Sequence, residues 1–186
     1  PEVINAFNVT GEDSWVLEIA VIDVAHLDAV VSKFCLLADT STSIVLNAPR
    51  ARVWRALTNA EEFGDWFGAN LKGQTFAPGQ RARGHMTFKG YEEYFFDVVV
   101  DRIEPENRMS FRWHPYPMDK TIDYDKEEPT LVTFTLEDAP NNATRLTVVE
   151  SGFDKVPPSR RAEAFRMNSG GWDNQMKRIA AHVESA

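Results

Sequence analysis

A run of short strand-like segments that ends in one long helical segment is the feature that most constrains the fold. Between residues 73 and 151, stretches rich in β-branched and aromatic residues alternate with turn sequences such as Ala77-Pro78-Gly79 and Ala139-Pro140-Asn141-Asn142. The spacing predicts an antiparallel meander with strands over Gly73–Phe76, Arg81–Phe88, Tyr94–Ile103, Met109–Tyr116, Thr130–Leu136 and Ala143–Ser151. A single long helix is then expected over Pro158–Glu184, where apolar residues recur at steps of three and four.

Two short helices precede this meander. The first is expected over Arg50–Leu57, directly after Pro49, and the second begins behind Thr58-Asn59 and carries Phe63, Trp66 and Phe67. A strand over Thr42–Asn47 leads into them. The prediction for this part of the chain is an α+β domain in which a curved antiparallel sheet wraps around a long C-terminal helix.

The first forty residues have a different pattern. Val3–Val9 and Trp15–Val21 are predicted to form a hairpin, and a helix is expected over Ala25–Ala38, with Cys35 on its apolar side. The change near residue 41 is a candidate domain boundary, so we expect a ββα appendage over residues 1–40 and a main domain over residues 41–186.

Charge and hydropathy exclude several classes of protein. The net charge is −8 and no cluster of Lys and Arg is present, which argues against nucleic acid as a partner. No stretch approaches the roughly 20 apolar residues that a membrane-spanning helix needs. With one cysteine and no recognisable signal peptide, a cytoplasmic location is expected.

Aromatic residues make up 11% of the chain and lie mostly after residue 50. They predict either a bulky core or an internal cavity for a small molecule, and composition does not separate the two. The candidate ligand-binding residues, each of which could equally be plain core, are Trp66, Met86, Trp113, Phe134, Phe165, Trp172 and Met176.

Titratable residues offer two weak catalytic candidates, Glu150 and His114. Glu150 shares a strand face with Leu146 and Val148, so its carboxylate is expected to point inward, as a polar ligand contact or general base, unless it leaves the pocket at the strand end or pairs with Arg112. The four histidines have no ligand-like spacing, and no metal site is predicted.

No phosphate-binding glycine loop is present, and no cofactor is expected. The acidic stretch Asp119–Glu128 is interpreted as a solvated loop or a flap over the cavity mouth.

Residues 41–186 resemble the START-like helix-grip domains of the family named after the activator of heat-shock protein 90 ATPase. The resemblance rests on segments that occur in the same order as in that family: 48–58, Phe63-Gly64-Asp65-Trp66-Phe67, Phe111-Arg112-Trp113-His114-Pro115, Glu150-Ser151-Gly152-Phe153 and Gly171-Trp172. Many bacterial members are labelled as polyketide-cyclase or lipid-transport relatives. The resemblance implies a cavity between the sheet and the long helix that accepts a hydrophobic small molecule.

The N-terminal segment resembles part of the effector domain of Lrp/AsnC-type regulators, over residues 7–17, 23–34 and 40–47. In those regulators the module forms dimers, which implies a homodimer through this segment.

Three functions are therefore kept open. The first hypothesis is binding of a hydrophobic or aromatic small molecule without catalysis. The alternatives are a cyclase or hydrolase that uses Glu150 or His114, and an interaction protein that docks a partner such as a chaperone.

Overall fold

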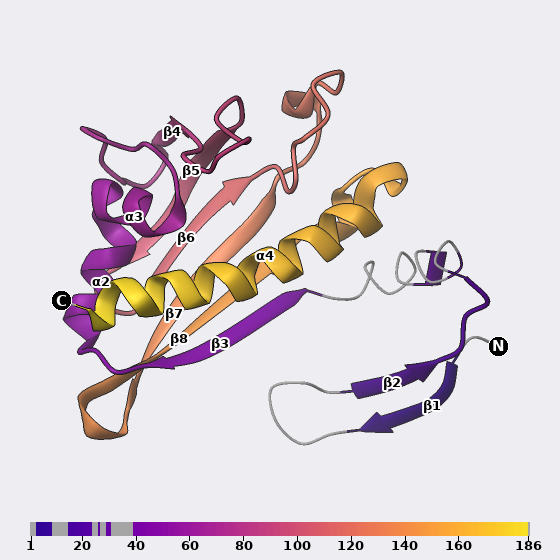
Figure 1. Ribbon diagram of the computed structural model, residues 1–186, viewed down its shortest axis with the longest axis horizontal. Coiled ribbons are helices and arrows are strands. Elements are labelled where there is room, and N and C mark those ends of the chain that lie inside the picture. The colour runs from indigo at the N-terminus through magenta and orange to yellow at the C-terminus, as the bar shows by residue number, and fades with distance from the viewer. Residues whose placement is uncertain (1–2, 9–14, 24–25, 27–28, 31–38, 186) are drawn as a thin grey trace.

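The structure, a computed structural model, describes residues 3–8, 15–23, 26, 29–30 and 39–185. Within these ranges the chain forms a two-stranded sheet near the N-terminus and a six-stranded antiparallel sheet that faces one long helix (Figure 1). The predicted α+β class, with a sheet around a C-terminal helix and an N-terminal appendage, is confirmed.

The N-terminal hairpin consists of β1 (Val3–Asn8) and β2 (Trp15–Ile19), which pair in antiparallel register. Figure 1 shows it set apart from the larger sheet. The predicted helix over residues 25–38, with Cys35, lies outside the described residues except at positions 26, 29 and 30, which are helical.

The larger sheet has the strand order β3-β8-β7-β6-β5-β4. The five strands from β4 to β8 follow one another as an antiparallel meander. β3 pairs with β8 and forms the edge of the sheet opposite to β4. The strands are β3 (Thr40–Leu46), β4 (Arg81–His85), β5 (Phe95–Glu104), β6 (Arg108–Trp113), β7 (Thr130–Ala139) and β8 (Ala143–Ser151).

Local sequence chemistry explains one of the hairpin turns. Between β7 and β8, Asn141 and Asn142 both have positive φ angles, of 62° and 58°. Consecutive residues with positive φ make a turn whose twist matches that of a hairpin, and asparagine tolerates this conformation better than most residues.

The strand predicted over Gly73–Phe76 is wrong. Instead, Gln74 uses its side chain where a strand would use its backbone: Nε2 donates to the Arg83 carbonyl at 2.8 Å, and Oε1 accepts from the Arg83 amide at 3.0 Å. Gly73, with a φ of 72°, also turns the chain out of an extended path. This segment therefore covers the β4 edge without joining the sheet.

Three helices complete the domain: α2 (Arg50–Thr58), α3 (Ala60–Phe67) and α4 (Pro158–Glu184). Asn59 caps α3 by accepting a hydrogen bond from the Glu62 amide at 2.9 Å, and Gly68 ends the helix with a φ of 91°. The main core lies between the concave face of the sheet and these helices, with Phe63, Phe96 and Phe111 at most 1% exposed.

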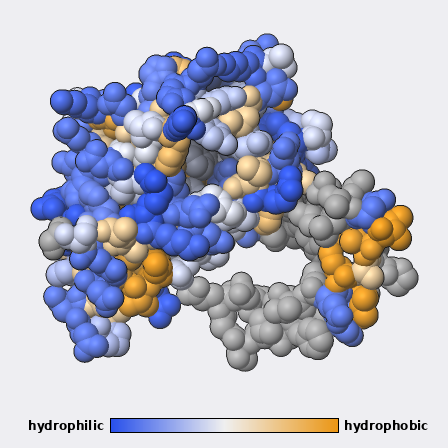
Figure 2. Space-filling view, viewed as in Figure 1, coloured by the Kyte–Doolittle hydropathy of each residue, from blue (hydrophilic) through white to orange (hydrophobic). Residues whose placement is uncertain are grey.

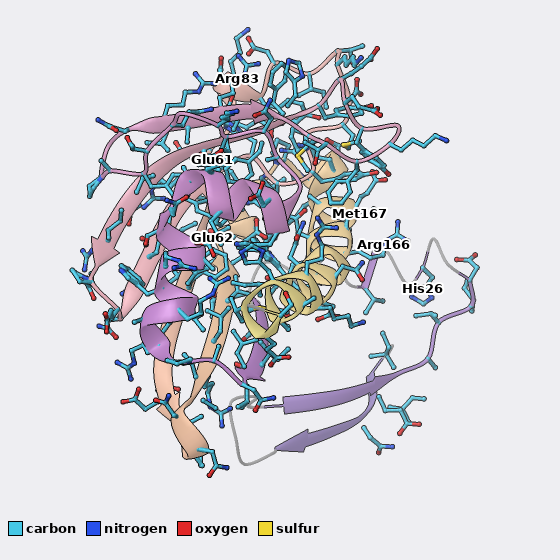
Figure 3. All side chains as sticks on the ribbon, turned by 60° about the vertical axis from the view of Figure 1, so that its left-hand side comes forward. His26, Glu61, Glu62, Arg83, Arg166 and Met167 are labelled. Carbon is cyan, nitrogen blue, oxygen red and sulfur yellow. The ribbon has the colours of Figure 1, made fainter. Side chains whose placement is uncertain are left out.

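Glu62 joins the three helices at the C-terminal end of α4 (Figure 3). Its carboxylate pairs with Arg52, with Arg55 at 3.0 Å and with His182 at 2.9 Å. Burial raises the pKa of Glu62, but the hydrogen bonds from His182 and Arg55 and the charges of Arg52 and Arg55 outweigh this, so the pKa lies below its ordinary value.

In the described part of the chain, no helix is both long enough and apolar enough to cross a membrane. Over the main domain, the face shown in Figure 2 is mostly hydrophilic, with apolar residues gathered in small patches.

Candidate functional site

A hollow of about 1050 Å³ opens beside α4 at the end of the sheet where β6 leads into the 114–129 loop. Its inner part lies between the concave face of the sheet and α4, and its wall there is made of Phe67, Met86, Phe96, Val98, Trp113, Asn168, Gly171, Trp172 and Gln175. Phe95, Asp97 and Val99 also line the hollow. Successive residues of a strand point to opposite faces of the sheet, so these three side chains lie on the face opposite to Phe96 and Val98. The outer part of the hollow therefore reaches the opposite face of β4–β6.

The outer part carries charges, but each cation is paired. Asp97 binds Arg81 at 2.6 Å and Arg83 at 3.2 Å, and Asp101 lies 3.4 Å from Arg112. Arg83, labelled in Figure 3, also lies 3.9 Å from the centre of the Phe95 ring. Charge is therefore confined to the rim and the outer face, whereas the named residues of the inner wall are neutral.

Two tryptophans form the central part of the inner wall. The rings of Trp113, from β6, and Trp172, from α4, have centroids 5.5 Å apart. Their indole nitrogens both donate to the carboxylate of Glu150, each at 2.8 Å. One buried acid therefore fixes the orientation of both aromatic rings.

Glu150 is fully buried, on the concave face of β8. Thr130 Oγ1 donates to its Oε1 at 2.7 Å, and Asn168 Nδ2 lies 3.0 Å from both carboxylate oxygens. Desolvation raises the pKa of Glu150 above its ordinary value, and the hydrogen bonds from Thr130, the tryptophans and Asn168 oppose that rise without cancelling it.

The Glu150 site can hold a proton without losing its packing. Thr130 Oγ1 also lies 3.3 Å from the Trp113 carbonyl, so its hydroxyl can donate to that oxygen and accept a hydrogen bond from the protonated carboxyl of Glu150 instead. Glu150 does not belong to the wall of the hollow, and its oxygens already accept from four side chains. This geometry suits a residue that positions the wall.

Arg112, the other predicted partner of Glu150, lies on the opposite face of the sheet. Trp113 and Phe111 point to the concave side, so Arg112 between them points outward and pairs with Asp101.

The predicted binding residues separate into four groups. Met86, Trp113 and Trp172 line the hollow, and Glu150 lies behind it. Trp66, Phe134 and Met176 are buried in the main core and do not line the hollow, and Trp66 donates its indole hydrogen to the Ala56 carbonyl at 2.8 Å. Phe165 packs against Phe153 in a separate small cluster, with ring centroids 5.1 Å apart.

His114 lines the hollow and its Nε2 lies 3.1 Å from the Glu127 carbonyl oxygen. The described residues contain no group of three His, Cys, Asp or Glu side chains that could hold a metal ion.

The 114–129 loop covers one side of the hollow and is fastened at both ends of its span. Arg160, at the start of α4, binds the Glu127 carboxylate through Nε at 2.9 Å and donates to the Pro115 carbonyl at 2.8 Å. Lys120 forms an ion pair with Glu93 on the opposite side of the opening. The acidic stretch, interpreted from the sequence as a solvated loop or a flap, contributes Ile122 and Tyr124 to the wall, together with the charged residues Asp119, Lys120, Asp123 and Asp125.

Asn168 and Gln175 were not predicted as site residues. Both lie on the face of α4 that carries Trp172, at steps of four and three residues. Two amides within an otherwise apolar helical stripe were the signal that could have indicated them.

The sheet and α4 with the hollow between them define the START-like helix-grip class. Residues 47–184 match the family model described as activator of Hsp90 ATPase homolog 1-like protein, and the chain belongs to this family. Residues 1–54 match the Lrp/AsnC ligand binding domain. No curated protein matches the chain.

Solved structures with the same fold cover about four fifths of this chain. Protein MLL2253 from Mesorhizobium loti is 24% identical with a TM-score of 0.61, over 80% of this chain and 98% of that one. DynU16, described as a putative protein in the dynemicin biosynthetic locus, is 26% identical with a TM-score of 0.58, over 79% of this chain and 47% of that one. The Aha1 dimer from Colwellia psychrerythraea is 16% identical with a TM-score of 0.58, over 80% of this chain and 97% of that one.

Proposed function

We propose that this chain binds a hydrophobic, aromatic small molecule in the hollow between the sheet and α4. The observation that carries the proposal is the neutral aromatic inner wall, in which Trp113 and Trp172 are held in place by Glu150. Cavities for small molecules are lined mainly by apolar and aromatic groups with a few polar ones.

Adjacent glycines in α4 provide a matched test. Gly171 lines the hollow and Gly170 does not, and a Cβ on either residue meets no atom within 4 Å. Replacement of either glycine by leucine removes an unfavourable helix residue, whose cost relative to alanine is about 0.8–1 kcal/mol, so neither variant should lose its fold. The side chain in Gly171→Leu would occupy part of the ligand's space.

We expect Gly171→Leu to weaken binding of N-phenyl-1-naphthylamine, a neutral fluorescent probe, by about tenfold or more, equivalent to about 1.4 kcal/mol. Gly170→Leu should bind as the wild type does. Fluorescence titration of the three proteins measures this. Equal affinity in both variants, or no binding by the wild type, would contradict the proposal.

We also propose that the N-terminal segment makes the protein a homodimer. A lone two-stranded hairpin is at best marginally stable and leaves strand edges unpaired, and β1–β2 forms such a sheet within the described residues. The match of residues 1–54 to the Lrp/AsnC ligand binding domain supports this proposal.

Deletion of residues 1–38 leaves β3 and the main sheet intact. We expect light scattering to give a dimer mass for the full chain and a monomer mass for the deletion variant. A shortened chain that remained dimeric would place the interface elsewhere.

A further inference from the structure

One polar atom of the cavity wall has no partner. Gln175 Oε1 is buried and accepts no hydrogen bond in the described part of the chain. Among the described residues, the other buried side-chain atoms without a partner belong to Thr40, Arg50, Arg52 and Arg108, none of which lines the hollow. A buried acceptor left unpaired costs about 1–3 kcal/mol, so a ligand that supplied a donor would recover part of that cost.

The orientation of the Gln175 amide is fixed by α3. Its Nε2 donates at 3.0 Å to the carbonyl of Phe67, one of the last residues of that helix, whose carbonyl has no partner within the helix. Turning the amide over would place its oxygen against the Phe67 carbonyl oxygen, and two acceptors cannot bond to each other. Oε1 is therefore the atom left to accept.

The surroundings of Gln175 disfavour an anion. The Glu150 carboxylate lies directly behind Trp113, Trp172 and Asn168, which share the inner wall with Gln175. The cations that line the hollow, Arg81, Arg83, Arg112 and Lys120, are paired with Asp97, Asp101 and Glu93 on the outer face or the rim. A negatively charged ligand group in the inner part would find no free cation among the described residues and would be repelled by an ionised Glu150.

We propose that the ligand is a neutral aromatic molecule with a hydroxyl or N–H group that donates a hydrogen bond to Gln175 Oε1. The inference rests on the proposed function and specifies the ligand class. Aromatic stacking against the two indoles supplies affinity, and Gln175 supplies selectivity for the donor.

A matched series of naphthalenes separates these contributions. 2-Naphthol carries a donor, 2-methoxynaphthalene has a similar shape without a donor, and 2-naphthoate is anionic at pH 8. Calorimetric titration of the wild type should rank 2-naphthol about three- to tenfold above 2-methoxynaphthalene, the ratio expected from one neutral hydrogen bond. 2-Naphthoate should bind most weakly.

The Gln175→Met variant tests the residue itself. Methionine keeps an unbranched side chain of similar length and removes the acceptor, so the preference for 2-naphthol over 2-methoxynaphthalene should disappear while 2-methoxynaphthalene binds as before. If the substitution acted only by loosening α3, both compounds would lose affinity equally, and that result would overturn the inference.

The outcomes for the two proposals are distinct. If all three compounds bound the wild type equally well, the ligand class would be wrong and the binding function would stand. If none bound, the proposed function would fail and the inference with it.

Discussion

Replacement of Glu150 by leucine is expected to lower the free energy of unfolding by about 3–5 kcal/mol. The substitution removes the acceptor for both indole N–H groups, for Thr130 and for Asn168, and all of these donors lie on buried or partly buried side chains. For a domain of this size the melting temperature should fall by about 10 °C, at 2–4 °C for each kcal/mol. Thermal and urea denaturation measure the change.

Glu137→Leu is the matched control for Glu150→Leu, since it makes the same substitution at an exposed position on the neighbouring strand β7. Its effect should stay within about 0.5 kcal/mol, as is usual for a surface site. A loss in Glu150→Leu no larger than in the control would show that the carboxylate does not hold the wall together.

Glu150 also makes the free energy of unfolding depend on pH, and its raised pKa sets the sign of that dependence. Because the pKa of Glu150 is raised in the folded protein, its protonated form is favoured by folding, and the benefit is fully present below the unfolded pKa. Relative to Glu150→Gln, the wild type should therefore lose stability as the pH rises from about 4.5 through the folded pKa. The pH dependence of Glu62, whose pKa is lowered, has the opposite sign and is the same in both proteins.

Gly84→Ala is the second substitution with a large expected effect. A Cβ on Gly84, in β4, would lie 1.9 Å from the backbone oxygen of Asn70 and 3.1 Å from Leu71 Cδ2. The backbone of the 69–71 segment must move, which would break the hydrogen bond from the Asn70 amide to the His85 carbonyl and displace the buried Leu71. We expect a loss of about 3 kcal/mol or more.

The same chemical change should have the opposite sign in α4. At Gly170 a Cβ meets nothing within 4 Å, so Gly170→Ala should raise the free energy of unfolding by up to about 1 kcal/mol. Melting curves of the two variants test both expectations. If Gly84→Ala melted at or above the wild-type temperature, the close packing of the 69–71 segment against β4 would be wrong.

The strands of the sheet could be predicted from the sequence because the residues in the turns between them have conformational preferences of their own. Pro140-Asn141-Asn142 and Gly68 mark the ends of elements by their own conformational preferences, and the strands between such marks are long enough to alternate. Gly73–Phe76 was mispredicted because the Gln74 side chain, and not the backbone, makes the hydrogen bonds to β4. Nothing local distinguishes that arrangement from an edge strand.

The site could be predicted only in part. Alternation along β8 placed Glu150 on the concave face, but not its donors, which come from β6, β7 and α4. Aromatic side chains of the core and of the wall look alike in a sequence: Trp66 and Trp172 are both buried and both donate their indole hydrogen, yet one lines the hollow and the other does not. Which of them faces open space depends on how α3 and α4 pack.

The central claim, that the hollow holds one neutral aromatic molecule, is tested most directly by native mass spectrometry of the gently purified protein, followed by organic extraction of anything bound. The account predicts one apolar adduct per chain, either retained from the cell or added as N-phenyl-1-naphthylamine, and a sharply reduced adduct in Gly171→Leu. An unshifted mass with every aromatic and lipid probe would contradict it.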